Sequence, residues 1–213
     1  MPELLWAIVE ALPDGVMLRL GMTNPPHIRE HMAEVAAVLR HPRVFKFLHI
    51  PVQSGSSRVL EAMRREYTVE HFEELADFMR ASVPGITLAT DIICGFPTET
   101  EDDFELTLRL LEKYRFPIVN IAQFYPRPGT AAARMPRLSS AVVKARSRRV
   151  TTLFEAYGTW GPLVGTQQRV WVSELGKDPR YVVGHTAGCC CRAMWRSSAA
   201  ASRPTSPPPK NGA

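Results

Sequence analysis

The residues with the clearest potential for chemistry lie in four short segments, at 19–26, 49–56, 90–100 and 124–130. Each combines glycine or proline with hydrogen-bonding side chains. Glycine lets the main chain approach a bound molecule closely, and Gln53 and Ser54 can both donate and accept hydrogen bonds. Arg65 can bind a carboxylate through two parallel hydrogen bonds. Each segment alone is more typical of an ordinary turn than of a binding site, so it is the series of four that favours a ligand-binding site.

The four cysteines are Cys94 and the adjacent Cys189, Cys190 and Cys191. Their spacing indicates no disulfide framework, which favours a reducing, cytoplasmic compartment. Cys94 lies in an apolar run and is expected to be a core thiol. Three adjacent thiolates cannot readily bind three corners of a single metal cluster, so no metal ligand is predicted among the cysteines. We expect these three cysteines to belong to a tail without function, with lipidation or opportunistic metal binding as the alternatives.

The apolar runs beside these segments predict the elements that must position them. Four runs, at 16–20, 45–51, 86–93 and 118–124, recur at intervals of roughly 30–40 residues, the length of a strand–helix unit. They are continuous rather than alternating, as in parallel strands that are buried on both faces. Helical patterns are predicted at 4–12, 25–39, 68–79, 100–111 and 140–157. The sequence therefore predicts an α/β sheet or barrel, whose strand ends would carry the site.

Composition narrows the classes of protein further. The chain has 213 residues, of which 45% are hydrophobic and 22% charged, as in globular proteins. No apolar run reaches the length of a transmembrane helix, and the N-terminus lacks the basic start of a signal peptide. The net charge of +5 mildly favours an anionic partner such as nucleic acid.

Three regions are predicted along the chain. Residues 1–160 form the α/β domain, and residues 161–187 contain two strand-like stretches, at 168–173 and 181–183, that could pair. Residues 188–213 contain Cys-Cys-Cys, Ala-Ala-Ala and Pro-Pro-Pro runs and are expected to be a disordered, low-complexity tail.

Three longer motifs resemble those of the methylthiotransferase family of radical S-adenosylmethionine (SAM) enzymes. They are Pro51–Ser56 followed by Met63–Thr68, then Asp91–Thr100 followed by Asp103 and Phe104, and Tyr125–Thr130. The segment 22–26 is similar to the branch that acts on N6-threonylcarbamoyladenosine in tRNA. The resemblance covers roughly residues 1–185. Thr98 departs from it, since many members have glycine there.

The resemblance implies a partial radical-SAM-type (β/α) barrel with about four parallel strands, followed by an incomplete TRAM-like RNA-binding segment at 161–187. It implies SAM and [4Fe–4S] clusters as cofactors and the tRNA anticodon loop as partner, with methylthiolation of the adenosine at position 37. Gln53 and Ser54 would lie against SAM, Arg65 would bind its carboxylate, and Arg19 would line the pocket. Asp91 and Gly95 would lie where the next strand meets the cofactor. Tyr125, Arg127 and Gly129 would face the tRNA.

The cysteine loop of such enzymes, Cys-x-x-x-Cys-x-x-Cys, does not occur in the chain. We therefore expect a fragment that is inactive alone and begins partway through the barrel. A second chain could supply the missing N-terminal half. Alternatives are a non-catalytic fragment that binds tRNA or SAM, and a truncated product without function. Eukaryotic relatives can be anchored to the endoplasmic reticulum by a tail that this sequence lacks. The basic segment 134–149 could face the tRNA backbone, or be an ordinary solvated helix face.

Overall fold

The computed structural model describes residues 2–175, 181–186 and 189–196. The chain divides into two compact units, with the boundary between Gln167 and Gln168. The first unit has the order α1(Pro2–Ala11), α2(Pro25–Arg29), α3(Met32–Leu39), β1(Phe47–His49), α4(Ser57–Ala62), α5(Val69–Ser82), β2(Thr87–Cys94), α6(Glu101–Tyr114), β3(Ile118–Gln123), η1(Ala131–Arg134), α7(Ser140–Glu155) and η2(Gly161–Leu163). Among the described residues, no helix is long and apolar enough to cross a membrane.

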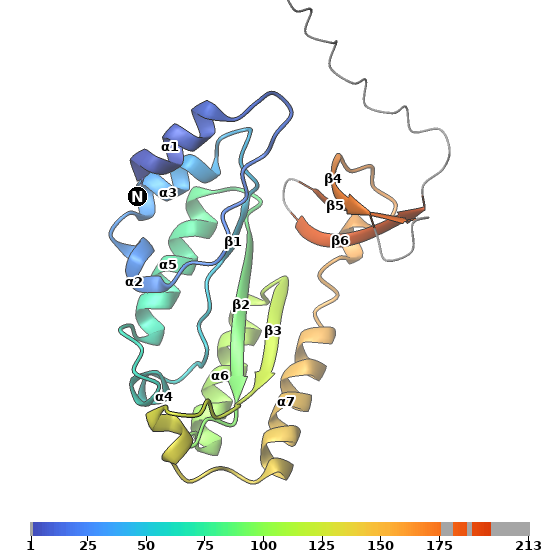
Figure 1. Cartoon of the computed structure of the whole chain (residues 1–213). Helices are drawn as coiled ribbons and strands as arrows, with labels where there is room; N and C mark the ends of the chain where they lie inside the picture. Colours follow the sequence, from blue (N-terminus) through green and yellow to red (C-terminus); the bar gives the residue numbers. More distant parts are fainter. Residues whose placement is uncertain (1, 176–180, 187–188, 197–213) are drawn as a thin grey trace, which may run out of the picture. The chain divides into compact units, whose positions relative to one another are not determined.

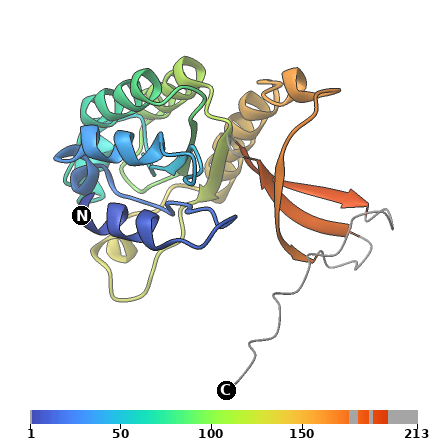
Figure 2. The same ribbon diagram turned by 90° about the horizontal axis from the view of Figure 1, so that it is seen from above.

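The first unit is built on a parallel sheet with the strand order β1-β2-β3 (Figure 1). Seen from above, α1, α3, α5, α6 and α7 follow one another in an arc around it (Figure 2). Three of the four predicted runs are therefore strands, and the α/β class is confirmed.

The remaining run, at 16–20, is not a regular strand, which corrects the expectation of about four. It makes isolated parallel bridges, from Leu18 to Val44 and from Met22 to His49. Four residue steps separate Leu18 from Met22, whereas five separate Val44 from His49. The register therefore slips by one residue, which interrupts the ladder as a bulge does.

The pattern at 25–39, predicted as one helix, forms two helices, α2 and α3. His31 interrupts them because its backbone, with φ −131° and ψ 24°, is not helical. The other predicted helices form near their expected bounds. Thr68 and Thr100 are N-caps, each in a capping box with the residue three positions later, His71 and Asp103.

The two faces of the sheet differ in character because alternate residues of a strand point to opposite sides. One face is buried in the hydrophobic core, which contains Leu48, Leu88, Ile92, Cys94, Val119, Leu39, Phe72, Leu75, Phe104 and Leu111. Cys94 is fully buried, so its prediction as a core thiol is confirmed. The other face, hereafter the open face, carries His49, Asp91, Ile93, Asn120 and Ala122, which are partly or largely exposed.

The second unit contains β4(Val170–Leu175), β5(Tyr181–Thr186) and β6(Cys189–Arg196), in the order β4-β5-β6. The two stretches that were expected to pair, β4 and β5, do so; their pairing is antiparallel, with an irregularity between Val172 and Glu174. β6 falls in the segment that was expected to be a disordered tail. Main-chain pairing can hold such a segment because it does not depend on side-chain composition. The rest of that segment, residue 188 and residues 197–213, lies outside the described residues. The TRAM-like character of 161–187 stays a prediction.

Candidate functional site

A cleft of about 600 Å³ opens where β2 and β3 end. Its volume is within the range of pockets that hold small ligands. Ile93 and Ala122 line it from the open face, and Phe96 and Phe124 line it from the strand ends. The other lining residues are Met63, Arg65, Gln123, Tyr125, Arg127, Thr130 and Ala132. The structure thus brings three predicted site residues together: Arg65, Tyr125 and Arg127.

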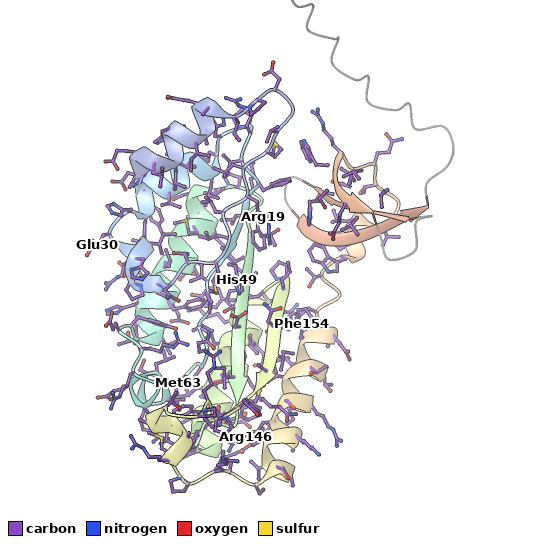
Figure 3. All side chains as sticks on the ribbon, viewed as in Figure 1. Arg19, Glu30, His49, Met63, Arg146 and Phe154 are labelled. Carbon is purple, nitrogen blue, oxygen red and sulfur yellow. The ribbon has the colours of Figure 1, made fainter. Side chains whose placement is uncertain are left out.

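Arg65 is placed by the tight end of α4. Arg64 adopts a left-handed conformation with φ 58°, and the Arg65 amide donates to the Leu60 carbonyl at 2.9 Å. The chain reverses there and leaves Arg65 half-buried among the residues that line the cleft. Met63, another lining residue, is labelled in Figure 3 close to α4. A guanidinium in this position can bind a carboxylate or phosphate group of a ligand.

Gln53 lies on the loop that follows β1 and is also left-handed, with φ 69°. Its amide donates to the Asp91 carbonyl, and its own carbonyl accepts from Ile93, one of the cleft residues. Left-handed non-glycine residues are strained and concentrate at functional sites. The surrounding loop is held by buried hydrogen bonds, from the Tyr67 hydroxyl to the carbonyls of Pro51 and Val52 and from Thr90 to the Ile50 carbonyl.

A chain of polar side chains crosses the open face below the cleft. Asp91 Oδ1 accepts from Asn120 Nδ2 at 2.8 Å, and His49 Nε2 lies 2.7 Å from the same oxygen. The carboxylate oxygen can only accept, so His49 donates through Nε2. Asp91 and Asn120 precede Ile93 and Ala122 by two residues, which places them roughly 7 Å from the cleft floor. His49 and Asn120 were not predicted as site residues, although their alternation with buried neighbours could have indicated them.

Like Gln53 and Asp91, three further predicted site residues lie outside the cleft lining. Ser54 is fully buried, and its hydroxyl contacts that of Thr107 and accepts from the Ser56 amide. Arg19 lies over the Phe47 ring, at 4.2 Å. Phe47 pairs with Thr87, six residues before Ile93 on β2, which corresponds to roughly 20 Å along the sheet. Gly129 is exposed and left-handed, and it turns the loop that carries Tyr125.

Gly95 lines a second cleft of about 490 Å³, which shares Gln123, Phe124 and Tyr125 with the first. Gly95 packs against α7 so closely that a Cβ atom would lie 2.5 Å from a methyl group of Val143. Its amide donates to Glu99 Oε2 at 2.8 Å, and Arg146 Nη1 donates to the same oxygen at 2.8 Å. Burial raises the pKa of Glu99, while the Gly95 amide and Arg146 favour its ionised form.

The basic segment 134–149 only partly fits the expected RNA-facing surface. Arg146 is buried in its pair with Glu99, and Arg149 pairs with Glu101 and Glu105 of α6. These two side chains join α7 to the rest of the unit. Arg134, Arg137, Lys144 and Arg148 are exposed and remain accessible to an anionic partner.

The residues whose side chains the structure describes do not fit an iron–sulfur cluster. In the part of the chain that the structure describes, no three His, Cys, Asp or Glu side chains lie close enough to hold a metal ion. Burial raises the pKa of the Cys94 thiol to about 12, which keeps it from forming the thiolate that a metal requires.

Comparison with known proteins defines the class. The family model of the Radical SAM superfamily matches residues 10–111. A solved structure of coproporphyrinogen III oxidase from Escherichia coli, described as a radical SAM enzyme, aligns with a TM-score of 0.59 and 18% identity, over 73% of this chain and 36% of that chain. The fold and the match therefore define a radical-SAM-type α/β protein.

Sequence comparison identifies the branch. The threonylcarbamoyladenosine tRNA methylthiotransferase of Drosophila melanogaster is 57% identical over 185 residues, 87% of this chain and 34% of the relative. The human protein of that name is 52% identical over 185 residues, 87% of this chain and 32% of the relative. The chain belongs to the radical SAM methylthiotransferase family, in the threonylcarbamoyladenosine branch. It spans about a third of the length of these relatives.

Proposed function

We propose that this chain supplies the SAM-binding and tRNA-facing part of a methylthiotransferase that converts N6-threonylcarbamoyladenosine at position 37 of tRNA to its 2-methylthio form. The observation that carries the proposal is the cleft at the ends of β2 and β3, which unites Arg65, Tyr125 and Arg127 in a chain of this family. The expected compartment is the cytoplasm, where tRNA is available.

The cleft residues fit the chemical groups of SAM. Arg65 would bind the carboxylate of its methionine part. The aromatic faces of Phe124 and Tyr125 suit a sulfonium cation, which aromatic rings attract. Gln53, held in its strained conformation beside Ile93, would hydrogen-bond to a polar group of the cofactor. The hydrogen bonds of His49 and Asn120 hold Asp91 through Oδ1, so that its other carboxylate oxygen would accept a hydrogen bond from the cofactor at the open face.

We propose that the cluster ligands come from polypeptide outside this sequence, because the chain has no Cys-x-x-x-Cys-x-x-Cys spacing. No reaction step is therefore assigned to the chain alone. Anaerobic reconstitution with iron and sulfide, followed by iron and sulfide assay, should give no [4Fe–4S] uptake. Stoichiometric cluster with cleavage of SAM would contradict this part of the proposal.

The test of SAM binding is isothermal titration of the full chain with SAM. Arg65→Ala should weaken binding at least tenfold, since it removes a charge-assisted pair, and Arg65→Lys should restore part of it. Arg109→Ala is the matched control because Arg109 is exposed on α6, outside both clefts. Equal affinity of the Arg65→Ala and Arg109→Ala variants would refute the assignment of Arg65.

A non-catalytic binding fragment is the alternative function. Adding a polypeptide that carries the family's cysteine loop would distinguish the two, since only a catalytic part would then support methylthiolation of a modified anticodon stem-loop. Binding of RNA or SAM without any product would favour the alternative.

A further inference from the structure

Two adjacent clefts share one wall at the end of β3. Gln123, Phe124 and Tyr125 line both the cleft of about 600 Å³ and the cleft of about 490 Å³. Arg65 and Arg127 lie on the first, and Arg137 lies on the second together with Pro126, Pro128, Leu138 and Ser140. Apart from the shared wall, the residues of the second cleft have no role in the SAM-binding assignment above.

Tyr125 is the most prominent part of the shared wall. Its side chain is 80% exposed, although it is a large aromatic residue. Exposed aromatic rings on basic surfaces are the usual stacking platforms for unpaired nucleobases. A ring that borders two clefts offers a surface to a ligand in each of them.

The wall is held in place by local structure. The Phe124 amide donates to the Cys94 carbonyl at 2.8 Å, and the Phe124 ring packs edge-on against Phe96 at 5.2 Å. The loop beyond contains two prolines and is closed by Thr130, whose hydroxyl donates to the Arg127 carbonyl at 2.8 Å. The shape of both clefts is therefore largely preformed, which lowers the entropic cost of binding.

The charge around the second cleft suits a polyanion. No Asp or Glu occurs between Glu112 and Glu155, and this span carries the exposed Arg127, Arg134, Arg137, Lys144 and Arg148. Glu99, whose carboxylate accepts from the Gly95 amide behind the cleft, is buried and paired with Arg146. Among the residues that the structure describes, no acidic side chain lines either cleft.

We propose that the second cleft binds the RNA nucleotide adjacent to the target adenosine, with its base against Tyr125 and its phosphate near Arg137. This inference rests on the proposed function, because it assumes an RNA substrate with the target base in the first cleft. The bulk of Tyr125 then separates the target base from its neighbour and fixes which nucleotide is presented to the cofactor.

The test is binding of an anticodon stem-loop RNA to the full chain, measured by fluorescence anisotropy at several salt concentrations. Arg137→Ala should lower RNA affinity about tenfold and reduce the dependence of log affinity on log salt by roughly 0.7, the value for one phosphate contact of a single strand. SAM affinity should not change. Arg148→Ala is the matched control, since Arg148 is an exposed arginine on α7, the helix that follows Arg137, but lines neither cleft.

A photoreactive 5-iodouridine beside position 37 identifies the contact directly. We expect crosslinks to Tyr125, and Tyr125→Ala should weaken RNA binding tenfold or more, while Tyr125→Phe retains most of the affinity. If the RNA binds but Arg137→Ala behaves like Arg148→Ala and crosslinks fall elsewhere, the cleft assignment is wrong while the proposed function stands. If no stem-loop RNA binds, the proposed function fails and this inference fails with it.

Discussion

Replacing Gly95 with alanine tests the junction between β2 and α7, on which the second cleft depends. Gly95 is left-handed, with φ +83°, and an added Cβ would lie 2.5 and 2.8 Å from the two methyl groups of Val143. A left-handed alanine costs about 1–2 kcal/mol, and overpacking a close contact costs about 1–3 kcal/mol. Valine cannot rotate away easily because it is branched at Cβ. We therefore expect Gly95→Ala to lower the free energy of unfolding by about 3 kcal/mol.

The same substitution at Gly85 separates the two causes. Gly85 is also left-handed, with φ +76°, but no atom lies within 4 Å of the position that a Cβ would occupy there. Gly85→Ala should therefore cost only the backbone component, about 1–2 kcal/mol. Val143→Ala removes the two methyl groups that clash, so the double variant Gly95→Ala/Val143→Ala should be at least about 1 kcal/mol more stable than the sum of the single effects.

The assay is urea denaturation of the full chain followed by circular dichroism, with the slope of the transition checked for each variant. The reasoning is refuted if Gly95→Ala costs no more than Gly85→Ala. It is equally refuted if the double variant shows simple additivity, because the strain would then not arise from contact with Val143.

Three further predictions concern the groups that hold the unit together. Asp103→Ala should destabilise the chain by about 2 kcal/mol through loss of a helix cap and charged hydrogen bonds. Burial opposes ionisation of Asp103, but hydrogen bonds from Arg58, Ser56 and Thr100 hold its pKa below the usual range. The difference in the free energy of unfolding between the variant and wild type should therefore shrink as pH falls below about 4. A difference that is independent of pH would contradict this. Glu99→Gln should cost about 3 kcal/mol because Arg146 loses its buried counter-charge and keeps only its ion pair with the exposed Glu101. Glu101→Gln should cost under about 1 kcal/mol in the same urea titration, since that carboxylate is exposed; equal losses would argue against the buried pair. Cys94, whose pKa is raised to about 12, should resist iodoacetamide at about pH 8 in the folded chain and react in urea, as followed by peptide mapping; rapid labelling of the native chain would show that the thiol is accessible.

Local patterns predicted much of the fold. The runs at 45–51, 86–93 and 118–124 became parallel strands, and the capping residues Thr68 and Thr100 begin their helices. These features depend on neighbours in the sequence. The irregular edge at 16–20 could not be predicted because it results from one extra residue between Val44 and His49 on a different segment.

The candidate site was predicted less completely than the fold. Arg65, Tyr125 and Arg127 meet at one cleft, but Ser54 points to Thr107 and Arg19 to Phe47. A sequence motif identifies candidate site residues. The direction in which each side chain points, however, depends on the register of the strands and on the packing of the helices. His49 and Asn120 were missed for the same reason, since their shared contact with Asp91 exists only when three strands are aligned.

The two-sided sheet has a consequence for how the sequence can vary. Along β2, Leu88, Thr90 and Ile92 face the core, whereas Asp91 and Ile93 face the open side. Neighbouring positions are therefore constrained differently. Side chains that face the core must fill a fixed volume, whereas those on the open face must keep particular chemical groups. In a saturation mutagenesis library of β2, tolerance of substitution should therefore alternate with a period of two. Core-facing positions should accept conservative apolar replacements. Substitutions at open-face positions should reduce ligand binding without reducing the abundance of the protein.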